Sequence, residues 1–234
     1  MTKLTNPFRN LTKFEWTLWL VSCAVVAASY LFSPDGSIMS LCASLIGVTA
    51  LIFVAKGHVV GQFLCIIFAV LYGIISFYFR YYGEMITYLC MSAPAAVAAV
   101  ISWLRNPYGK TDEVKVGKMN AAKWTGSVLL SIAVTVAFYF ILKALHTANL
   151  MFSTLSVATS FLASSLTFLR SPYYALAYAA NDVVLIVLWV LAALADPAYL
   201  PMIFCFVMFL ANDLYGFFNW RRMKRRQERV IENL

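Results

Sequence analysis

Apolar residues occur along this chain in eight long runs, which short polar segments separate. The runs cover residues 16–32, 38–55, 59–79, 85–104, 124–142, 150–169, 173–194 and 199–220. A helix needs about 20 apolar residues to cross the hydrocarbon core of a bilayer, and about 17 still suffice. Each break contains a charged residue, a glycine or a proline, which are residues that interrupt helices. The pattern therefore predicts an all-α integral membrane protein with eight transmembrane helices.

The composition agrees with a membrane protein, and in a membrane protein a positive net charge does not by itself indicate nucleic-acid binding. The 234 residues are 62% hydrophobic and only 12% charged, whereas a soluble domain carries about 25% charged residues. A net charge of +8 would suit a nucleic-acid partner. The basic residues, however, lie between the apolar runs and at the chain ends, which indicates a charge bias across a bilayer. We therefore expect no nucleic-acid partner.

The placement of the basic residues also predicts the orientation of the chain in the membrane. If the N-terminus is cytoplasmic, all of the 18 Lys and Arg residues except Arg80 and Lys143 fall in cytoplasmic loops or tails. Cytoplasmic segments of membrane proteins carry such an excess of basic residues. We therefore expect both termini in the cytoplasm. The basic C-terminal tail would orient the chain and contact anionic membrane lipid.

Two groups of three segments, the second to fourth and the sixth to eighth, share a weak internal repeat. In each group the first segment ends in a basic residue, Lys56 or Arg170, and the third ends in Trp103 or Trp220 followed by basic residues. The first pair is separated by 114 residues (170 − 56) and the second by 117 (220 − 103). Because equivalent segments are four apart, both groups have the same orientation. Parallel repeats of this kind build some transporters.

The repeat divides the chain into five predicted parts, in the arrangement 1+3+1+3. The fifth segment is then a linker helix between two parallel three-helix bundles, and the first segment is an N-terminal addition. The parts are the cytoplasmic N-terminus with an extra transmembrane helix at 1–37, the first bundle at 38–106, a cytoplasmic loop and linker helix at 107–149, the second bundle at 150–220, and a basic cytoplasmic tail at 221–234.

Two carboxylates lie deep in the apolar runs, and each directly follows an asparagine. They form the pairs Asn181-Asp182 in the seventh run and Asn212-Asp213 in the eighth. At a rise of about 1.5 Å per residue, both pairs lie roughly 10–13 Å from the cytoplasmic ends of their antiparallel helices. Ionisable groups at such depth face a cavity or the bundle interior, and they mark functional sites. The alternative is that the asparagines only hydrogen-bond neighbouring helices and the acids are structural.

Amide and aromatic side chains accompany the two pairs at helical spacing. Amides both donate and accept, which suits carboxamide and hydroxyl groups, while aromatic faces attract planar cationic rings. A ribosylated pyridinium ligand would use all of these groups. The predicted substrate-binding residues are Gln62, Tyr178, Asn181, Asp182, Trp189, Asn212, Asp213 and Tyr215.

Neither a metal site nor an enzyme is indicated. The five cysteines all fall inside apolar runs and form no CxxC or Cys/His pair, and a metal ion would need more carboxylates. His58 and His146 lie in loops and are interpreted as solvated. An intramembrane enzyme with Asp182 and Asp213 as paired acids stays an alternative, although no HExxH or GxSxG motif accompanies them. We expect no catalytic residue and no cofactor.

Three stretches together resemble one family of bacterial vitamin transporters. They are WLRNPYGKTDEVKV after the fourth run, YAANDVVLIVLWVL in the seventh and NDLYGFFNWRRM in the eighth. They are similar to the PnuC family, whose best-known members carry nicotinamide riboside, and the likeness extends over residues 38–225. The resemblance implies a fold like that of the SWEET sugar transporters, a homotrimer and a place in the bacterial inner membrane.

The resemblance also implies a mechanism and three substrate contacts. Uptake would occur by facilitated diffusion, driven by phosphorylation of the substrate inside the cell. By position in the matching stretches, Asn181 and Asn212 would bind the carboxamide or ribose, and Trp189 would stack on the ring. The expected function is therefore passive uptake of nicotinamide riboside. Relatives in the family take thiamine or riboflavin, so these vitamins are the alternative substrates.

Overall fold

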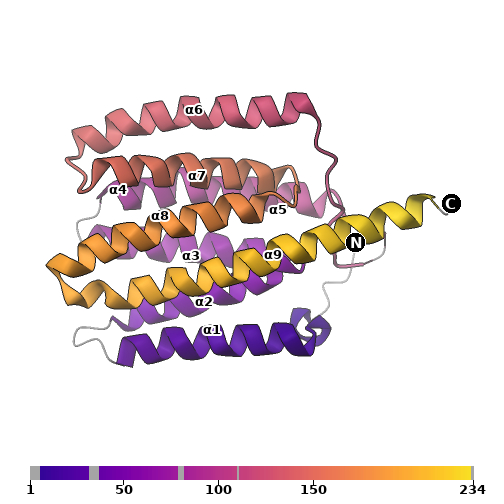
Figure 1. Ribbon diagram of the computed structural model, residues 1–234, viewed down its shortest axis with the longest axis horizontal. Helices are drawn as coiled ribbons and strands as arrows, with labels where there is room; N and C mark the ends of the chain where they lie inside the picture. The colour runs from indigo at the N-terminus through magenta and orange to yellow at the C-terminus, as the bar shows by residue number, and fades with distance from the viewer. Residues whose placement is uncertain (1–5, 32–36, 79–81, 110, 233–234) are drawn as a thin grey trace.

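The computed structural model describes residues 6–31, 37–78, 82–109 and 111–232, and within these ranges its regular elements are helices (Figure 1). Only two isolated β-bridges occur there, both in loops. The elements are η1 (Pro7–Asn10), α1 (Lys13–Leu31), α2 (Ile38–Ala55), α3 (Val59–Tyr78), α4 (Tyr82–Ile86), η2 (Thr87–Ser92), α5 (Ala93–Leu104), α6 (Ala121–Ala144), α7 (Leu150–Phe168), α8 (Tyr174–Ala195), η3 (Pro197–Tyr199) and α9 (Leu200–Glu232).

Eight of these segments are long and apolar enough to cross a membrane, with α4, η2 and α5 acting as one span. Their ends lie within three residues of the apolar runs, except at the C-terminus of α9. The agreement follows from the need of each helix to hide its backbone polar groups from lipid along the whole hydrocarbon core. The predicted all-α membrane fold with eight spans is therefore confirmed for the part of the chain that the structure describes.

The fourth span is interrupted by η2, a turn of π-helix. The N–H of Ala93 bonds to the carbonyl of Tyr88, five residues earlier, and Pro94 follows at once. Proline has no N–H and crowds the preceding turn, so a wider turn before it relieves the helix. The π-turn brings Tyr88 and Ser92 toward the centre of the molecule, where both line a cavity.

Six of the spans form a closed ring through their packing contacts. Around the ring α2 packs on α3, α3 on α5, α5 on α7, α7 on α8, α8 on α9, and α9 on α2. The first bundle (α2, α3, α5) and the second bundle (α7, α8, α9) thus meet at two junctions, α2–α9 and α5–α7. Each junction joins the first helix of one bundle to the last helix of the other. This packing fits the predicted pair of parallel repeats.

The two remaining spans lie outside the ring, on opposite sides of it in Figure 1. Helix α1 packs on both α2 and α9 and therefore covers their junction. Helix α6 packs on α7, and most of its apolar side chains are exposed. An exposed apolar helix of this length is suited to contact with lipid. The positions of α1 and α6 fit their predicted roles as an addition and a linker.

Helices α2 and α7 end in the same type of C-terminal cap, and this cap shows which residues of the two bundles are equivalent. Gly57 has a φ of 67° and Arg170 a φ of 56°, and after each the next N–H bonds to a carbonyl five residues earlier, as in a Schellman cap. These bonds join His58 to Phe53 and Ser171 to Leu166, each at 2.9 Å. Gly57, rather than Lys56, is therefore the counterpart of Arg170, and the offset is 113 residues (170 − 57) rather than 114.

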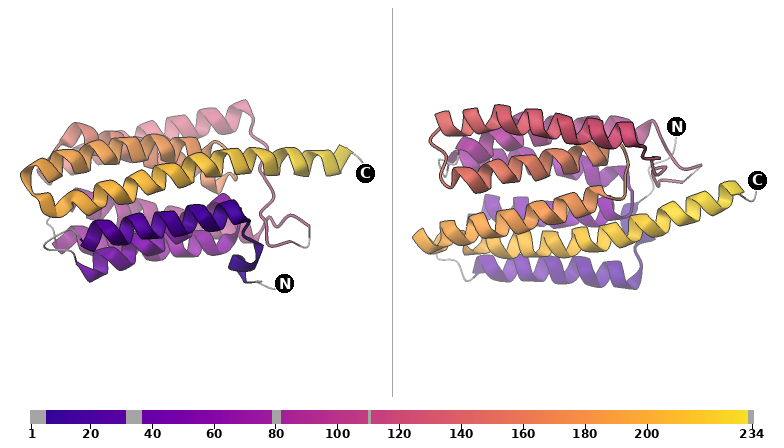
Figure 2. Two further views of the ribbon diagram at one scale, coloured as in Figure 1. Left: turned by 60° about the horizontal axis from the view of Figure 1, so that its bottom comes forward. Right: turned by 45° about the horizontal axis from the view of Figure 1, so that its top comes forward.

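Both termini lie at one end of the molecule (Figures 1 and 2). The loops at this end hold Lys56, Arg105 and Arg170, and we call it the basic end. Among the described basic residues, Lys143 alone lies at the opposite end, in the last turn of α6. Arg80, the other predicted exception, lies outside the described residues. The charge asymmetry expected from the sequence is thus present between the two ends of the bundle.

Helix α9 continues well beyond residue 220, where its apolar run ends. Its C-terminal turns pack on the loop that precedes α6. The Gln227 amide donates to the Val114 carbonyl at 3.1 Å and to Glu113 at 2.8 Å, and it accepts from the Val116 N–H at 2.8 Å. Arg226 adds an ion pair with Glu113. Part of the predicted basic tail is therefore an ordered helix that holds this loop.

The same loop covers His58, which corrects one expectation. Its position in a loop predicts a solvated histidine, but His58 is only 6% exposed, because it forms an antiparallel bridge with Glu113 and lies beside Phe53. Burial lowers the pKa of His58, which keeps the imidazole neutral at neutral pH. Its Nδ1 accepts a hydrogen bond from the Val60 N–H at 3.2 Å. His146 is exposed, as expected.

Candidate binding cavity

A cavity lies inside the six-helix ring, and every segment of the ring contributes to its lining. Its volume is about 100 Å³. Pockets that hold small molecules usually measure about 300–1,000 Å³, so in this conformation the cavity is contracted. Its polar and ionisable lining comprises Gln62, Cys65, Tyr88, Ser92, Ser160, Tyr178, Asn181, Asp182 and Asp213.

Five of the eight predicted site residues come together in this cavity. Their side chains lie on three helices, because α8 packs directly on α9 and all three helices face the centre of the ring. All are polar or ionisable groups in otherwise apolar spans, which is the signal that picked them out in the sequence. The five are Gln62, Tyr178, Asn181, Asp182 and Asp213.

The amides in the cavity keep hydrogen-bonding capacity for a ligand. The Asn181 side-chain oxygen accepts from the hydroxyls of Ser156 at 3.1 Å and Thr159 at 2.9 Å, both on α7. That engagement leaves the amide NH₂ of Asn181 as the available donor at the cavity. The Gln62 side chain is buried and forms no hydrogen bond with another described residue. The Tyr178 hydroxyl shares a hydrogen bond of 3.0 Å with Ser164.

The two acids of the cavity lie close to each other. Asp182 on α8 and Asp213 on α9 are both buried, both line the cavity, and their carboxyl groups interact electrostatically. Two carboxylates in one buried site repel each other, so ionisation of both is unfavourable. No lysine or arginine is among the residues that line the cavity in the described part of the chain.

The two halves of the ring line the cavity with equivalent positions but different chemistry. In the first bundle these positions are mostly small or apolar, whereas the second bundle supplies most of the amide, hydroxyl and carboxyl groups. The cavity therefore has one apolar wall and one polar wall. The equivalent pairs are Gly47 and Ser160, Cys65 and Tyr178, Phe68 and Asn181, Ala69 and Asp182, Ser92 and Phe209, and Ala96 and Asp213.

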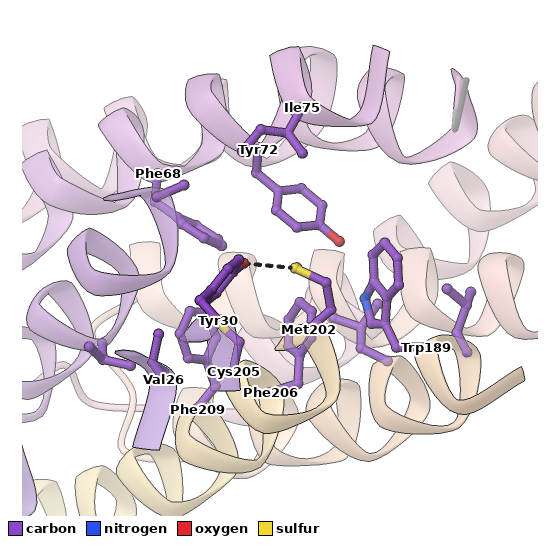
Figure 3. Close-up of a cluster of buried hydrophobic side chains, with 14 of the residues drawn as sticks. Val26, Tyr30, Phe68, Tyr72, Ile75, Trp189, Met202, Cys205, Phe206 and Phe209 are labelled. Atoms are coloured by element: carbon purple, nitrogen blue, oxygen red, sulfur yellow. Dashed lines mark hydrogen bonds between the residues drawn. The ribbon is translucent and has the colours of Figure 1, made fainter. Parts of the chain in front are cut away.

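Aromatic rings line the part of the cavity that lies toward the end opposite the basic end, and Figure 3 shows them in a buried cluster. Phe68 and Phe206 both lie against Phe209, with centroid distances of 5.4 Å. Tyr72 lies beyond them and contacts Tyr88 at 4.3 Å. The rings form part of a buried cluster that includes side chains of both bundles and of α1. This packing separates the polar wall from that end of the molecule.

Trp189 belongs to this aromatic cluster and does not line the cavity. Its ring lies 6.4 Å from the ring of Tyr72 and 5.7 Å from that of Tyr199 (Figure 3). Seven residues after Asp182 along α8, it shares the inner face of the helix but lies about 10 Å farther along the axis. A stacking role for Trp189 stays a prediction. In this conformation its ring packs within the aromatic cluster instead.

Asn212 and Tyr215 also lie away from the cavity, on the face of α9 that α1 covers. The Asn212 amide donates to the Ser22 hydroxyl of α1 at 2.9 Å and to the Met208 carbonyl at 2.8 Å. The Tyr215 hydroxyl donates to the buried carboxylate of Glu15 at 2.5 Å. In this structure both side chains attach α1 to the ring. Their predicted substrate contacts stay predictions that the lining of the cavity does not support.

Sequence reasoning did not pick out four polar or ionisable residues of the cavity, Cys65, Tyr88, Ser92 and Ser160. Single serines and tyrosines are common in membrane helices, where they pack closely or bond neighbouring helices. For one of them the repeat contains a signal, because Ser160 is polar whereas the equivalent position in the first bundle is Gly47. Within the described ranges, no group of three His, Cys, Asp or Glu residues comes together.

Together these features define a class of protein. A membrane-embedded ring of two parallel helical bundles, with a polar wall at mid-depth between them, is the architecture of a transporter. Residues 37–222 match the family model of the nicotinamide mononucleotide transporters. The match covers most of the chain, and the chain belongs to this family. It begins at the start of α2, so α1 lies outside the matched region.

Curated relatives and a solved structure agree with this assignment. The nicotinamide riboside transporter PnuC of Neisseria mucosa is 27% identical over 94% of this chain and 85% of its own length. PnuC of Haemophilus influenzae is 23% identical over 96% of this chain and 97% of its own length. A crystal structure of the vitamin B3 transporter PnuC superposes with a TM-score of 0.80 at 27% identity, over 93% of this chain and 94% of that one. All three are named transporters, in agreement with the expectation that the protein is not an enzyme.

Proposed function

We propose that this protein carries nicotinamide riboside across the bacterial inner membrane. The polar wall of the cavity is the observation that carries the proposal. It presents the amide of Asn181 and the buried carboxyl pair of Asp182 and Asp213, and Gln62 adds a second amide from the opposite bundle. Nicotinamide riboside has a carboxamide, ribose hydroxyls and a positively charged pyridinium ring. Each of these groups has a complementary partner in the wall.

The wall favours a nucleoside over a nucleotide, although the family model is described by the mononucleotide. A phosphate ester carries about two negative charges, and a buried anion needs positively charged or multiple N–H partners. The described lining has neither lysine nor arginine, and it holds the acid pair Asp182–Asp213. Placing a phosphate beside that pair is electrostatically unfavourable. The uncharged ribose of a nucleoside has no such cost.

We assign the binding roles to the five residues that line the cavity. Asn181 and Gln62 bind the carboxamide or the ribose, and Tyr178 contacts the ring from α8. Asp182 and Asp213 compensate the pyridinium charge. The apolar wall of the first bundle, where Phe68 and Ala69 lie, takes the flat face of the ring. Thiamine, which also contains a cationic ring, is the alternative substrate that the acid pair permits; riboflavin lacks that charge.

The proposed mechanism is facilitated diffusion with both termini in the cytoplasm. The cavity is too small for a nucleoside in this conformation, so the two bundles must move relative to each other for substrate to enter and leave, as in other repeat-based transporters. The two acids form an isolated pair in the cavity lining rather than a chain of proton-accepting groups, which fits passive transport. Net uptake then depends on phosphorylation of the substrate inside the cell. A homotrimer stays a prediction from the family resemblance.

Titration calorimetry on detergent-purified protein tests the substrate. Nicotinamide riboside is expected to bind saturably, with nicotinamide mononucleotide, thiamine and riboflavin at least tenfold weaker. Asn181→Ala removes a buried donor and is expected to weaken binding about tenfold or more, whereas the exposed Asn10→Ala serves as the control. Asp182→Asn should weaken binding of the cation while sparing the neutral dihydro form of the nucleoside. Absence of saturable nicotinamide riboside binding by the wild type would refute the proposal.

A further inference from the structure

Two tryptophans at the basic end make the same hydrogen bond across the two junctions of the ring. Trp103, near the end of α5 in the first bundle, donates its indole N–H to the Thr167 carbonyl of α7 at 3.0 Å. Trp220, on α9 in the second bundle, donates to the Val54 carbonyl of α2 at 2.9 Å. The donors are 117 residues apart and the acceptors 113, as the repeat requires. Each bundle therefore gives one indole bond to the other and receives one.

The residue before each tryptophan repeats the pattern. The Ser102 hydroxyl donates to the Phe168 carbonyl at 2.6 Å, and the Asn219 amide donates to the Ala55 carbonyl at 2.8 Å. These acceptors are also equivalent, with an offset of 113 residues. Carbonyls in the last turn of a helix lack a partner within the helix and carry partial negative charge. The ends of α2 and α7 thus offer acceptors to the donors of the opposite bundle, and the Val54 and Thr167 carbonyls also accept from the N–H groups of Gly57 and Arg170.

The two indole rings meet between the junctions. Their centroids are 5.3 Å apart, and the Trp220 ring lies 5.0 Å from that of Tyr174. Trp103 is 2% exposed and Trp220 is not exposed, so the rings fill the space at this end of the ring. Val54, whose carbonyl accepts the Trp220 bond, also lines the cavity. The paired tryptophans therefore lie directly between the cavity and the basic end.

We propose that Trp103 and Trp220 are the gate that closes the basic end of the transport path. Any motion that separates the two bundles at this end stretches both indole bonds at once, because each bond joins the two bundles. It also pulls the two rings apart, which opens the cavity toward the basic end. Ser102 and Asn219 support the gate through their own bonds across the same junctions. The proposal rests on the proposed transport function, since a gate acts only on a path that substrate follows.

Cys65 provides a built-in probe of the gate, because its side chain lines the cavity. Variants carry Cys65 as the sole cysteine, and a charged, membrane-impermeant methanethiosulfonate reagent is applied to inside-out or right-side-out membrane vesicles. The rate of Cys65 modification then reports how often the cavity is open to each side, without any substrate. The substitutions Trp103→Phe and Trp220→Phe keep an aromatic ring and delete one indole N–H each.

A matched control removes an indole bond that does not join the bundles. The Trp19 N–H donates to the Thr49 hydroxyl at 3.0 Å, between α1 and α2, so Trp19→Phe deletes a bond of the same kind outside the junctions. The gate variants are expected to raise the rate of Cys65 modification from the basic end about threefold or more. This is the increase in the open population expected when the closed state loses one interhelical hydrogen bond. Trp19→Phe is expected to stay at the wild-type rate.

Equal modification rates in the gate variants and Trp19→Phe overturn the proposal. If either tryptophan variant does not fold, Ser102→Ala and Asn219→Ala carry the same expectation, and wild-type rates in both overturn it as well. Binding of nicotinamide riboside is measured separately on each preparation. Raised Cys65 modification without nicotinamide riboside binding supports the gate and rejects the substrate. Binding with unchanged modification rejects the gate and leaves the substrate standing.

Discussion

Adjacent residues on α9 serve opposite sides of the helix. Successive residues of an α-helix are separated by about 100° around its axis, so Asp213 faces the cavity while Asn212 faces α1. Sequence depth alone placed both in one site, because depth measures position along a helix and not rotation about it. The carboxyl of Asp213 is thereby paired with Asp182, and the amide of Asn212 becomes a bond between α9 and the outer helix.

This separation predicts different effects for the two asparagines. Asn212→Ala removes the bond to the Ser22 hydroxyl and is expected to lower stability by about 1 kcal/mol while leaving nicotinamide riboside affinity unchanged. Asn181→Ala is expected to weaken nicotinamide riboside binding and to lower stability less than Asn212→Ala does. Thermal unfolding in detergent and titration calorimetry measure the two quantities. A loss of affinity in Asn212→Ala equal to that in Asn181→Ala would restore Asn212 to the substrate site.

At the scale of elements, a close contact between α2 and α3 lies beside the cavity. A Cβ on Gly61 of α3 would lie 2.5 Å from the Val54 nitrogen and 2.8 Å from the Ala50 oxygen of α2. Both are backbone atoms, so neither can move without shifting α2. Small residues let membrane helices approach in this way. The approach positions Gln62, the next residue, at the wall of the cavity.

Gly61→Ala is therefore expected to separate α2 from α3. Overpacking of this kind costs about 1–3 kcal/mol and should also weaken nicotinamide riboside binding, because Gln62 moves with its helix. Gly126→Ala on α6 is the matched control, since a Cβ there meets no atom within 4 Å and the substitution favours the helix by about 0.5–1 kcal/mol. Thermal unfolding of both variants checks the expectation. Equal stability of the two would show that α2 and α3 tolerate a wider spacing.

The sequence predicted most elements at this scale and missed two. Runs of apolar residues mark the spans, because lipid excludes polar groups over a fixed length. The π-turn at Thr87–Ser92 and the extension of α9 past residue 220 were not predicted. The π-turn depends on the local backbone hydrogen-bonding pattern before Pro94. The second depends on contacts of Gln227 with a loop more than 100 residues earlier in the chain.

At the scale of the whole molecule, the charge asymmetry predicts the orientation in the membrane. With the basic end in the cytoplasm, green fluorescent protein fused to the C-terminus is expected to fluoresce. Alkaline phosphatase, which is active only outside the cytoplasm, is expected to be active when fused after Thr147 and inactive when fused after Lys115. These two positions lie at opposite ends of α6, so they form a matched pair. The reverse pattern of phosphatase activity would contradict a cytoplasmic basic end.

The amino-acid sequence by itself determined the number of spans, the parallel repeat and the two deep acids. Each of these follows from what a residue contributes locally, namely transfer to lipid, charge, or the cost of a buried carboxyl group. Only the tertiary structure decided which faces meet. It paired Asp182 with Asp213, moved Asn212 and Tyr215 to the α1 contact, and joined Trp103 to α7 and Trp220 to α2. Such pairings depend on the rotation and packing of whole helices, which residue types along the chain do not specify.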